Sequence, residues 1–427
     1  MNPPRATEIF TPGSFPKYTY IEQTDKRYED RLRDGLETPG QVIALSGPSK
    51  SGKTVLVERV VGRDNLITIT GAGILHPDDV WTRILDWMDL PSETSRTNTV
   101  EGRATVGGEI TGGLQVPILA KGEATGKGEL QAAGTTAGSK LHRRRGLSQV
   151  VAEIGRSDFV VLIDDFHYMP REVQEEVAKQ VKEAVRQEVK IVIASVRHRS
   201  DDIVRANPEL RGRVMAVNLH YWERHYLRAI AERGFGLLDV ELNPATYDEF
   251  VTESAGSPQL MQAICLNACF ELNLRTKGPT YRQLTPSEDQ RRAIFERTVP
   301  TADFRSLVDV LDSGPKTRGT ERKMYQFRDG TEGDVYRCIL KAIASNPPHL
   351  TFPYDDILDR VHTTCVRDEP VGSSITGSCT QMSKLALEKF PKERVIDWDE
   401  QKLVLDIPDP YLLFYLRWSD RLIEPED

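Results

Sequence analysis

The stretch QVIALSGPSKSGKT at residues 41–54 decides the fold of this chain. An apolar run at 42–45 predicts a buried strand, which leads into a glycine-containing loop at 47–54 and then into an apolar helical pattern at 55–60. Phosphate groups bind to converging backbone N–H groups at a helix N-terminus, and glycines permit this approach because they carry no side chain. Strand, loop and helix in this order are the context that a phosphate-binding loop (P-loop) requires, so the stretch predicts nucleotide binding.

The chemistry of the P-loop gives its residues separate roles. We expect Lys53 to reach the β- and γ-phosphates of ATP and the Thr54 hydroxyl to hold Mg²⁺. The residues expected to bind ATP are Gly47, Pro48, Ser49, Lys50, Ser51, Gly52, Lys53, Thr54 and Val55.

A second apolar run, FVVLI at 159–163, ends in two aspartates and has the form of a Walker B strand. We expect Asp164 to act on the metal side, together with Thr54, and Asp165 to act on the attacking water. Because Asp is one methylene shorter than the Glu that many such ATPases use, slow turnover is possible. The alternative is that Asp165 only caps the next helix, which would leave Asp164 in its role and remove the candidate base.

Further apolar runs at 66–70, 190–195 and 215–219 raise the number of predicted strands to five, with helical patterns between them. The helical pattern after Pro170 places four apolar residues on one stripe. Strands alternating with helices predict an α/β fold with a doubly wound parallel sheet.

The order of these motifs resembles the AAA+ ATPases, and within them the origin-recognition-like clade and the STAND signal-transduction NTPases with their archaeal-ATPase branch. The resemblance spans roughly residues 18–427. It implies that Ser195, at the end of the fourth strand, is the sensor 1 residue and that Arg197 acts just beyond it. It also implies that Arg211 or Arg213 is an arginine finger for a neighbouring subunit. The alternative for both arginines is an ordinary surface ion pair.

The segment ESAGSPQLMQAIC at 253–265 falls where these families begin a lid helix. Its G-x-P form resembles the STAND lid, in which the region of the proline, here Pro258, touches the nucleotide. The sensor 2 arginine of many AAA+ proteins has no counterpart here, which favours a switch over a continuously cycling enzyme. The simpler interpretation is a helix start at Ser257. Upstream, Tyr18 or Tyr20 could stack on adenine or could simply be packed.

Toward the C-terminus, three amphipathic helical patterns at 335–343, 354–361 and 375–390 precede a predicted strand pair, and this order predicts a winged helix. Residues 331–427 hold 11 basic and 18 acidic residues. Because duplex DNA binding depends on a basic face, we expect this domain to contact a protein partner and consider DNA disfavoured.

The expected domains are an N-terminal segment near the adenine site (1–40), the ATPase core (41–235, with an insertion at about 93–145), a helical lid (236–300), a linker (301–333) and the winged helix (334–427). Within the insertion, polar residues alternate with small or apolar ones over 103–130, which is a strand signal. Three interpretations stay open: a flexible loop, a hairpin that pairs with neighbouring subunits, and a membrane-inserting hairpin.

The composition bounds the function classes. Charged residues are 28% of the chain and the formal net charge is −8, which argues against general nucleic-acid coating. The five cysteines lack paired metal spacing, and the N-terminus lacks a signal-peptide pattern, so we expect a cytoplasmic protein. The leading hypothesis is an ATP-hydrolysing switch of the AAA+/STAND type. It would form a homo-oligomer when nucleotide and a trigger bind, and the resemblance places it in prokaryotic defence or stress signalling. The alternative is a DNA-engaging AAA+ ATPase of the initiator or transposition-regulator type, which needs a basic surface that 140–145 could begin.

Overall fold

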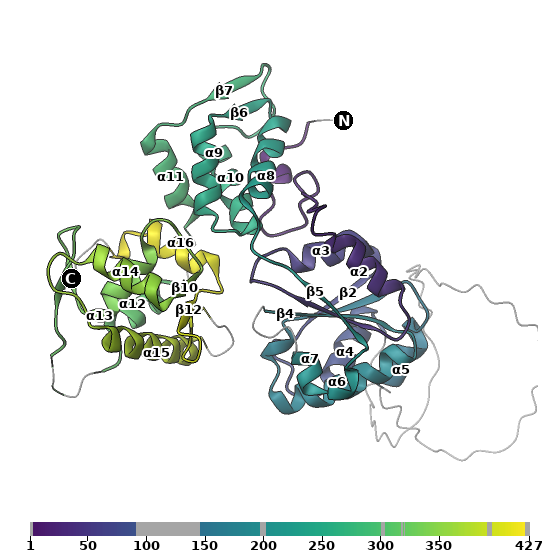
Figure 1. Cartoon of the computed structure of the whole chain (residues 1–427). Helices are drawn as coiled ribbons and strands as arrows, with labels where there is room; N and C mark the ends of the chain where they lie inside the picture. The colour runs from purple at the N-terminus through teal and green to yellow at the C-terminus, as the bar shows by residue number, and fades with distance from the viewer. Residues whose placement is uncertain are drawn as a thin grey trace, which may run out of the picture.

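The computed structural model describes residues 3–90, 146–196, 202–299, 304–316, 319, 321–390 and 395–422. The predicted hairpin at 103–130 and the basic cluster at 140–145 lie outside these ranges. Figure 1 shows three groups of elements: a sheet flanked by helices, a helical lid around α8 to α11, and a C-terminal group from α12 to α16.

Five parallel strands form the central sheet, in the order β2-β3-β4-β1-β5. Every residue of β1 is buried, as expected for a parallel strand covered on both faces. The predicted doubly wound parallel sheet is therefore confirmed. The strands are β1 (Val42–Ser46), β2 (Leu66–Thr70), β3 (Val160–Asp164), β4 (Lys190–Ser195) and β5 (Val214–Asn218).

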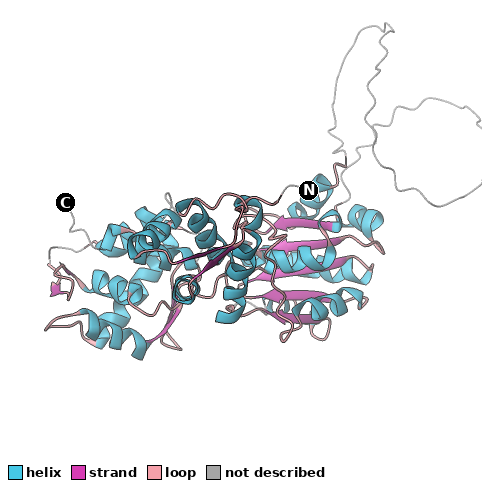
Figure 2. Cartoon of the chain, turned by 90° about the horizontal axis from the view of Figure 1, so that it is seen from above, coloured by secondary structure: helices cyan, strands magenta, loops and turns pink. Residues whose placement is uncertain are grey.

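Helices cover both faces of this sheet (Figures 1 and 2). One face carries α2 (Tyr28–Glu37) and α3 (Lys53–Val61). The predicted stripe after Pro170 lies in α6, where Val173, Val177, Val181 and Ala184 are buried. The opposite face is covered by α4 (Asp78–Trp87), α5 (Leu147–Ile154), α6 (Arg171–Arg186) and α7 (Asp202–Ala206).

The lid has its own apolar core, which also holds Ala6, Ile9 and Phe10 from near the N-terminus. Ile9 and Phe10, at and after the end of α1 (Ala6–Ile9), are fully buried in this core, and the Phe10 ring lies 5.2 Å from that of Phe235. The first part of the N-terminal segment therefore belongs structurally with the lid, whereas α2, in its second part, packs on the central sheet. The lid elements are α8 (Arg224–Leu237), β6 (Val240–Leu242), α9 (Pro244–Glu253), α10 (Pro258–Glu271), β7 (Arg282–Leu284) and α11 (Glu288–Thr298).

The C-terminal group begins with a helix and a hairpin. After this hairpin come one helix, one strand, two helices, two strands and a final helix. Its small antiparallel sheet has the order β10-β12-β11. The elements are α12 (Phe304–Ser313), β8 (Tyr325–Gln326), β9 (Glu332–Gly333), α13 (Val335–Ala344), β10 (Thr351–Pro353), α14 (Tyr354–Thr364), α15 (Gly372–Lys389), β11 (Asp397–Asp399), β12 (Val404–Asp406) and α16 (Pro410–Trp418).

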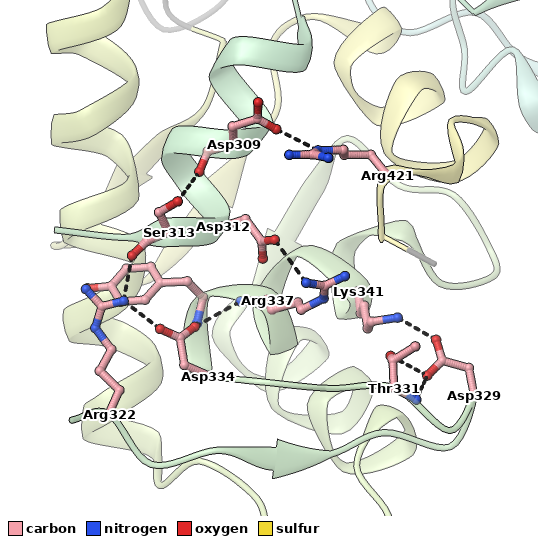
Figure 3. A network of polar contacts seen from close by, with 11 residues as sticks. Asp309, Asp312, Ser313, Arg322, Asp329, Thr331, Asp334, Arg337, Lys341 and Arg421 are labelled. Carbon is pink, nitrogen blue, oxygen red and sulfur yellow. Dashed lines mark hydrogen bonds and ion pairs between the residues drawn. The ribbon is translucent and has the colours of Figure 1, made fainter. Parts of the chain in front are cut away.

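The segment expected to be a linker differs from that expectation, because α12 and β8 pack into the C-terminal core. Ion pairs join the same segment of the chain to α13 and to its N-cap residue Asp334, as Figure 3 shows. The most buried of these pairs connects Arg337 of α13 to Asp312 of α12 at 3.4 Å. Breaking a buried pair leaves an uncompensated charge and is strongly destabilising, so these contacts fix α12 to the rest of the group.

No helix within the described ranges is long and apolar enough to cross a membrane.

Candidate nucleotide site

The P-loop turns sharply between β1 and α3. Lys50 and Gly52 have φ angles of 58° and 93°, in the left-handed region that glycine adopts without a Cβ penalty. A Cβ on Gly47 would lie 2.8 Å from the Cβ of Leu219, so the start of the loop has no room for a side chain. The turn places the N-terminus of α3 at the carboxyl end of β1, which is the geometry of an anion site.

Lys53 is only 9% exposed, and its Nζ donates to the carbonyl oxygens of Gly47 at 3.2 Å and Pro48 at 2.8 Å. Burial lowers the pKa of Lys53, while the charges of Asp164 and Asp165 act in the opposite direction. The ammonium group is thus held against the loop that would carry phosphates.

Thr54 and Asp164, the two predicted metal-side residues, are in direct contact. Thr54 Oγ1 donates to Asp164 Oδ2 at 2.8 Å. A hydroxyl and a carboxylate oxygen are ligands that Mg²⁺ binds together with nucleotide phosphates and water. These residues fit the ion and would hold it.

Asp165 follows β3 directly, with φ of 55°. It occupies the N-cap position of the short helix η2 (Phe166–Tyr168) but makes no side-chain capping hydrogen bond there. Its backbone N–H donates to Asp164 Oδ1 at 2.9 Å. Both aspartates line the same cavity as the P-loop.

That cavity has a volume of about 440 Å³, within the range of small-molecule sites. Gly47 and Pro48 provide the carbonyl oxygens that accept from Lys53. Tyr18 does not line the cavity. Several walls were not expected from the sequence: Thr11, Phe15, Gln23, Glu29, Trp222 and Gln262. The predicted residues that line it are Tyr20, Ser49, Lys50, Ser51, Gly52, Lys53, Thr54, Val55, Asp164, Asp165 and Pro258.

Ser195 ends β4 directly beside Ser46, the last residue of β1. The backbone N–H of Gly47 donates to the Ser195 carbonyl at 3.3 Å, so Ser195 lies next to the start of the P-loop. Arg197 lies outside the described residues.

Arg211 and Arg213 are exposed just before β5, at the end of the sheet where its parallel strands begin. The backbone N–H of Val42 donates to the Arg213 carbonyl at 2.8 Å, which places Arg213 at the beginning of β1, whereas the P-loop follows its end. The five residues of β1, at ~3.3 Å each, separate this end of the sheet from the P-loop. Any contact of either arginine with a γ-phosphate would therefore involve the site of another subunit.

The P-loop also contacts the lid. Trp222 Nε1 donates to the Ser51 carbonyl at 3.0 Å, and Ser257 Oγ donates to the Lys50 carbonyl at 3.4 Å. Ser257 is at the same time the N-cap of α10, accepting from the Leu260 N–H. The expected helix start at Ser257 and a contact with the nucleotide loop thus occur together.

The C-terminal group reaches the P-loop as well. Lys50 Nζ lies 2.9 Å and 2.7 Å from the two carboxylate oxygens of Asp409, and 4.5 Å from the ring centroid of Tyr411. Asp409 accepts from the Tyr411 N–H and so caps α16. No local pattern in the sequence predicts this contact, because the two partners are 359 residues apart.

No protein-family model matches the sequence, and no curated protein is significantly similar to it. Among solved structures, the Walker-type ATPase PABY2304 of Pyrococcus abyssi is similar at 14% identity and a TM-score of 0.48, over 93% of this chain and 96% of that one. The ORC2 protein of Aeropyrum pernix, in ADPNP–ADP complexes, is similar at 11% identity and a TM-score of 0.48, over 97% of both chains. Cdc6p of Pyrobaculum aerophilum is similar at 12% identity and a TM-score of 0.42, over 97% of this chain and 98% of that one.

Proposed function

We propose that this chain is an ATP-binding and ATP-hydrolysing switch of the AAA+/STAND type. The observation that carries the proposal is the contact of the P-loop residue Lys50 with Asp409 and Tyr411. The loop that would bind phosphates is also the place where the C-terminal group is attached. A change at the nucleotide therefore acts directly on the arrangement of the chain.

The chemistry at the phosphate end follows from four residues. Lys53 would exchange its carbonyl partners for phosphate oxygens when ATP enters, which replaces neutral acceptors by charged ones. Thr54 and Asp164 would hold Mg²⁺, which neutralises phosphate charge when bound. Asp165, beside them, would orient or deprotonate the attacking water.

Phosphate binding and the Lys50–Asp409 contact compete on electrostatic grounds. The Lys50 ammonium group pairs with either the Asp409 carboxylate or a phosphate, and the carboxylate repels a phosphate placed near it. Coupling between two such events is typically worth about 1–3 kcal/mol. We infer that ATP weakens the attachment of the C-terminal group to the P-loop.

Helix α16 connects this contact to the lid. Arg417 makes two hydrogen bonds to the Glu253 carboxylate of α9, at 2.9 Å and 2.7 Å, and both side chains are under 10% exposed. Trp418 Nε1 donates to the same carboxylate at 2.7 Å. Phe414, on the same helix, lies in the lid core. Helix α16 is thus bound to the P-loop at its N-terminal end and to the lid at its C-terminal end. Loss of the contact between Lys50 and Asp409 would therefore affect the lid and the C-terminal group together.

Assembly is the proposed output of the switch. The exposed position of Arg211 and Arg213, one strand length from their own P-loop, supports a homo-oligomer in which each subunit completes the site of its neighbour. The acidic C-terminal group favours a protein trigger over DNA. The part in defence or stress signalling rests on the sequence resemblance, and membrane contact would need the 103–130 segment.

Light-scattering mass measurements on the full chain test the proposal. We expect a small species without nucleotide and with ADP, and a larger one with a non-hydrolysable ATP analogue. Lys53→Ala should stay small under all conditions. A mass that never changes with nucleotide, together with tight duplex DNA binding at physiological salt, would replace the switch by the DNA-engaging alternative.

A further inference from the structure

Glu29 is a buried acidic residue in the wall of the nucleotide cavity. It lies in the first turn of α2 and is 7% exposed. Within the described part of the chain, its carboxylate takes part in one side-chain hydrogen bond, in which the Tyr20 hydroxyl donates to Oε1. A buried carboxylate is costly unless donors compensate it, and one neutral donor compensates it only partly.

Tyr20 is held so that it can only donate to this carboxylate. Burial and the neighbouring Glu29 raise the pKa of Tyr20, so the phenol keeps its proton. Its ring is in contact with protein groups: Phe15 lies nearly parallel to it at 5.9 Å, and the Arg59 guanidinium lies 5.2 Å from its centroid. These contacts favour packing, one of the two alternatives that the sequence leaves open for Tyr20, and they position its hydroxyl against Glu29.

Tyr20 and Glu29 line the same cavity as the P-loop residue Lys53. Arg59 follows Lys53 by six residues along α3, which is about 9 Å along a helix axis. With phosphates at Lys53, the base would extend toward Tyr20 and Glu29.

The neighbouring polar wall is already satisfied by the protein. Gln262 accepts from the Thr11 N–H at 3.2 Å and donates to Thr19 Oγ1 at 2.8 Å. These bonds fix the N-terminal segment against the lid and use both ends of the amide. Gln262 therefore offers neither end of its amide to a ligand, whereas Glu29 keeps Oε2 without a side-chain hydrogen bond among the described residues.

We propose that Glu29, oriented by Tyr20, accepts a hydrogen bond from the exocyclic amino group of adenine and thereby selects ATP among purine nucleotides. This inference rests on the proposed nucleotide site. Inosine has a carbonyl in place of that amino group. Its oxygen would face the Glu29 carboxylate, and because both groups are acceptors no hydrogen bond would form between them. Guanine presents two donors on one edge, a ring N–H and an amino group, and this edge suits a carboxylate whose two oxygens are both open. In this site Tyr20 already donates to Oε1 of Glu29.

Titration calorimetry with ATP and ITP on the full chain provides the test. We expect the unmodified chain to prefer ATP by about 10- to 100-fold, the worth of a hydrogen bond to a charged group. Glu29→Gln should reduce the ratio to within about threefold, because an amide accepts from adenine and donates to inosine equally well. Tyr20→Phe should reduce the ratio partly. Glu37→Gln, the same change at the exposed end of α2, should leave the ratio unchanged.

The outcomes separate the two proposals. Equal binding of ATP and ITP by the unmodified chain, or an unchanged ratio in a folded Glu29→Gln variant, would overturn the base assignment and leave the nucleotide site standing. A chain that binds neither nucleotide would overturn both. Preference for GTP over ATP would show that Glu29 reads the guanine edge, which also contradicts the assignment.

Discussion

Replacing Asp409 by asparagine removes one negative charge 2.7 Å from Lys50 Nζ and keeps an oxygen that can cap α16. Exposed ion pairs contribute about 0.2–1 kcal/mol, and hydrogen bonds to buried charged groups about 1.5–3 kcal/mol. The Lys50 and Asp409 side chains are 28% and 15% exposed, between these cases, so we take about 1.5 kcal/mol. If phosphate must displace this pair, the substitution should tighten ATP-analogue binding roughly tenfold.

Calorimetry with a non-hydrolysable ATP analogue measures this effect. Asp420→Asn is the matched control, because Asp420 is an exposed acid of the same C-terminal group whose ion pair is with Arg292. In a Lys50→Ala background, Asp409→Asn should change the affinity for the ATP analogue little, because the cation that couples phosphate binding to Asp409 is gone. Unchanged or weaker binding by a folded Asp409→Asn variant would refute the competition between phosphate and the C-terminal group.

The other predictions concern the phosphate end and the attachment of α16. Lys53→Ala should lower ATP affinity at least 100-fold by calorimetry, and retained affinity would contradict the P-loop assignment. Asp165→Asn should slow phosphate release by about 10²- to 10⁴-fold while ATP still binds, and Asp165→Glu should turn over at least as fast as the unmodified chain. If both variants hydrolyse ATP at the original rate, Asp165 is not the base. Arg417→Ala should lower the free energy of unfolding by about 3–5 kcal/mol because it leaves Glu253 buried and charged, whereas the more exposed Arg421→Ala should cost less than about 1 kcal/mol. Equal melting temperatures for these two variants would contradict the buried-pair argument.

The sequence predicts the central sheet because each of its signals is local. The strand at 42–46, the loop after it and α3 are contiguous, and the stripe of α6 repeats within a single helix. The P-loop is also recognisable from its glycines, because Gly47 has no room for a side chain beside Leu219 and Gly52 adopts a positive φ. For these elements the signal lies in consecutive residues, although the strands that they form pair across long stretches of sequence.

The remaining walls of the site come from contacts between distant segments. Glu29 meets Tyr20 across a loop, Gln262 meets Thr11 across 251 residues, and Lys50 meets Asp409 across 359. No periodicity encodes such pairings, because each partner looks like an ordinary surface residue in its own segment.

The assignment of 301–333 as a linker failed to anticipate α12 for a different reason. Leu307, Val308 and Leu311 follow a helical spacing, but the polar residues that come after them at 313–333 dominate the composition of the segment. Among the described residues of that stretch, Arg322 pairs with Asp334 and Asp329 pairs with Lys341, and composition does not reveal such contacts.

The burial of Phe10 in the lid makes a distant glycine important for the ligand. Any side chain at Gly234 of α8 would overlap the Phe10 ring, and Phe10 immediately precedes the segment from Thr11 onward that lines the cavity. A substitution at Gly234 would therefore expel the phenylalanine and pull away one wall, although position 234 does not line the cavity. Genetic screens for loss of nucleotide response should recover such alleles, and they would look like folding defects until the N-terminal segment is examined.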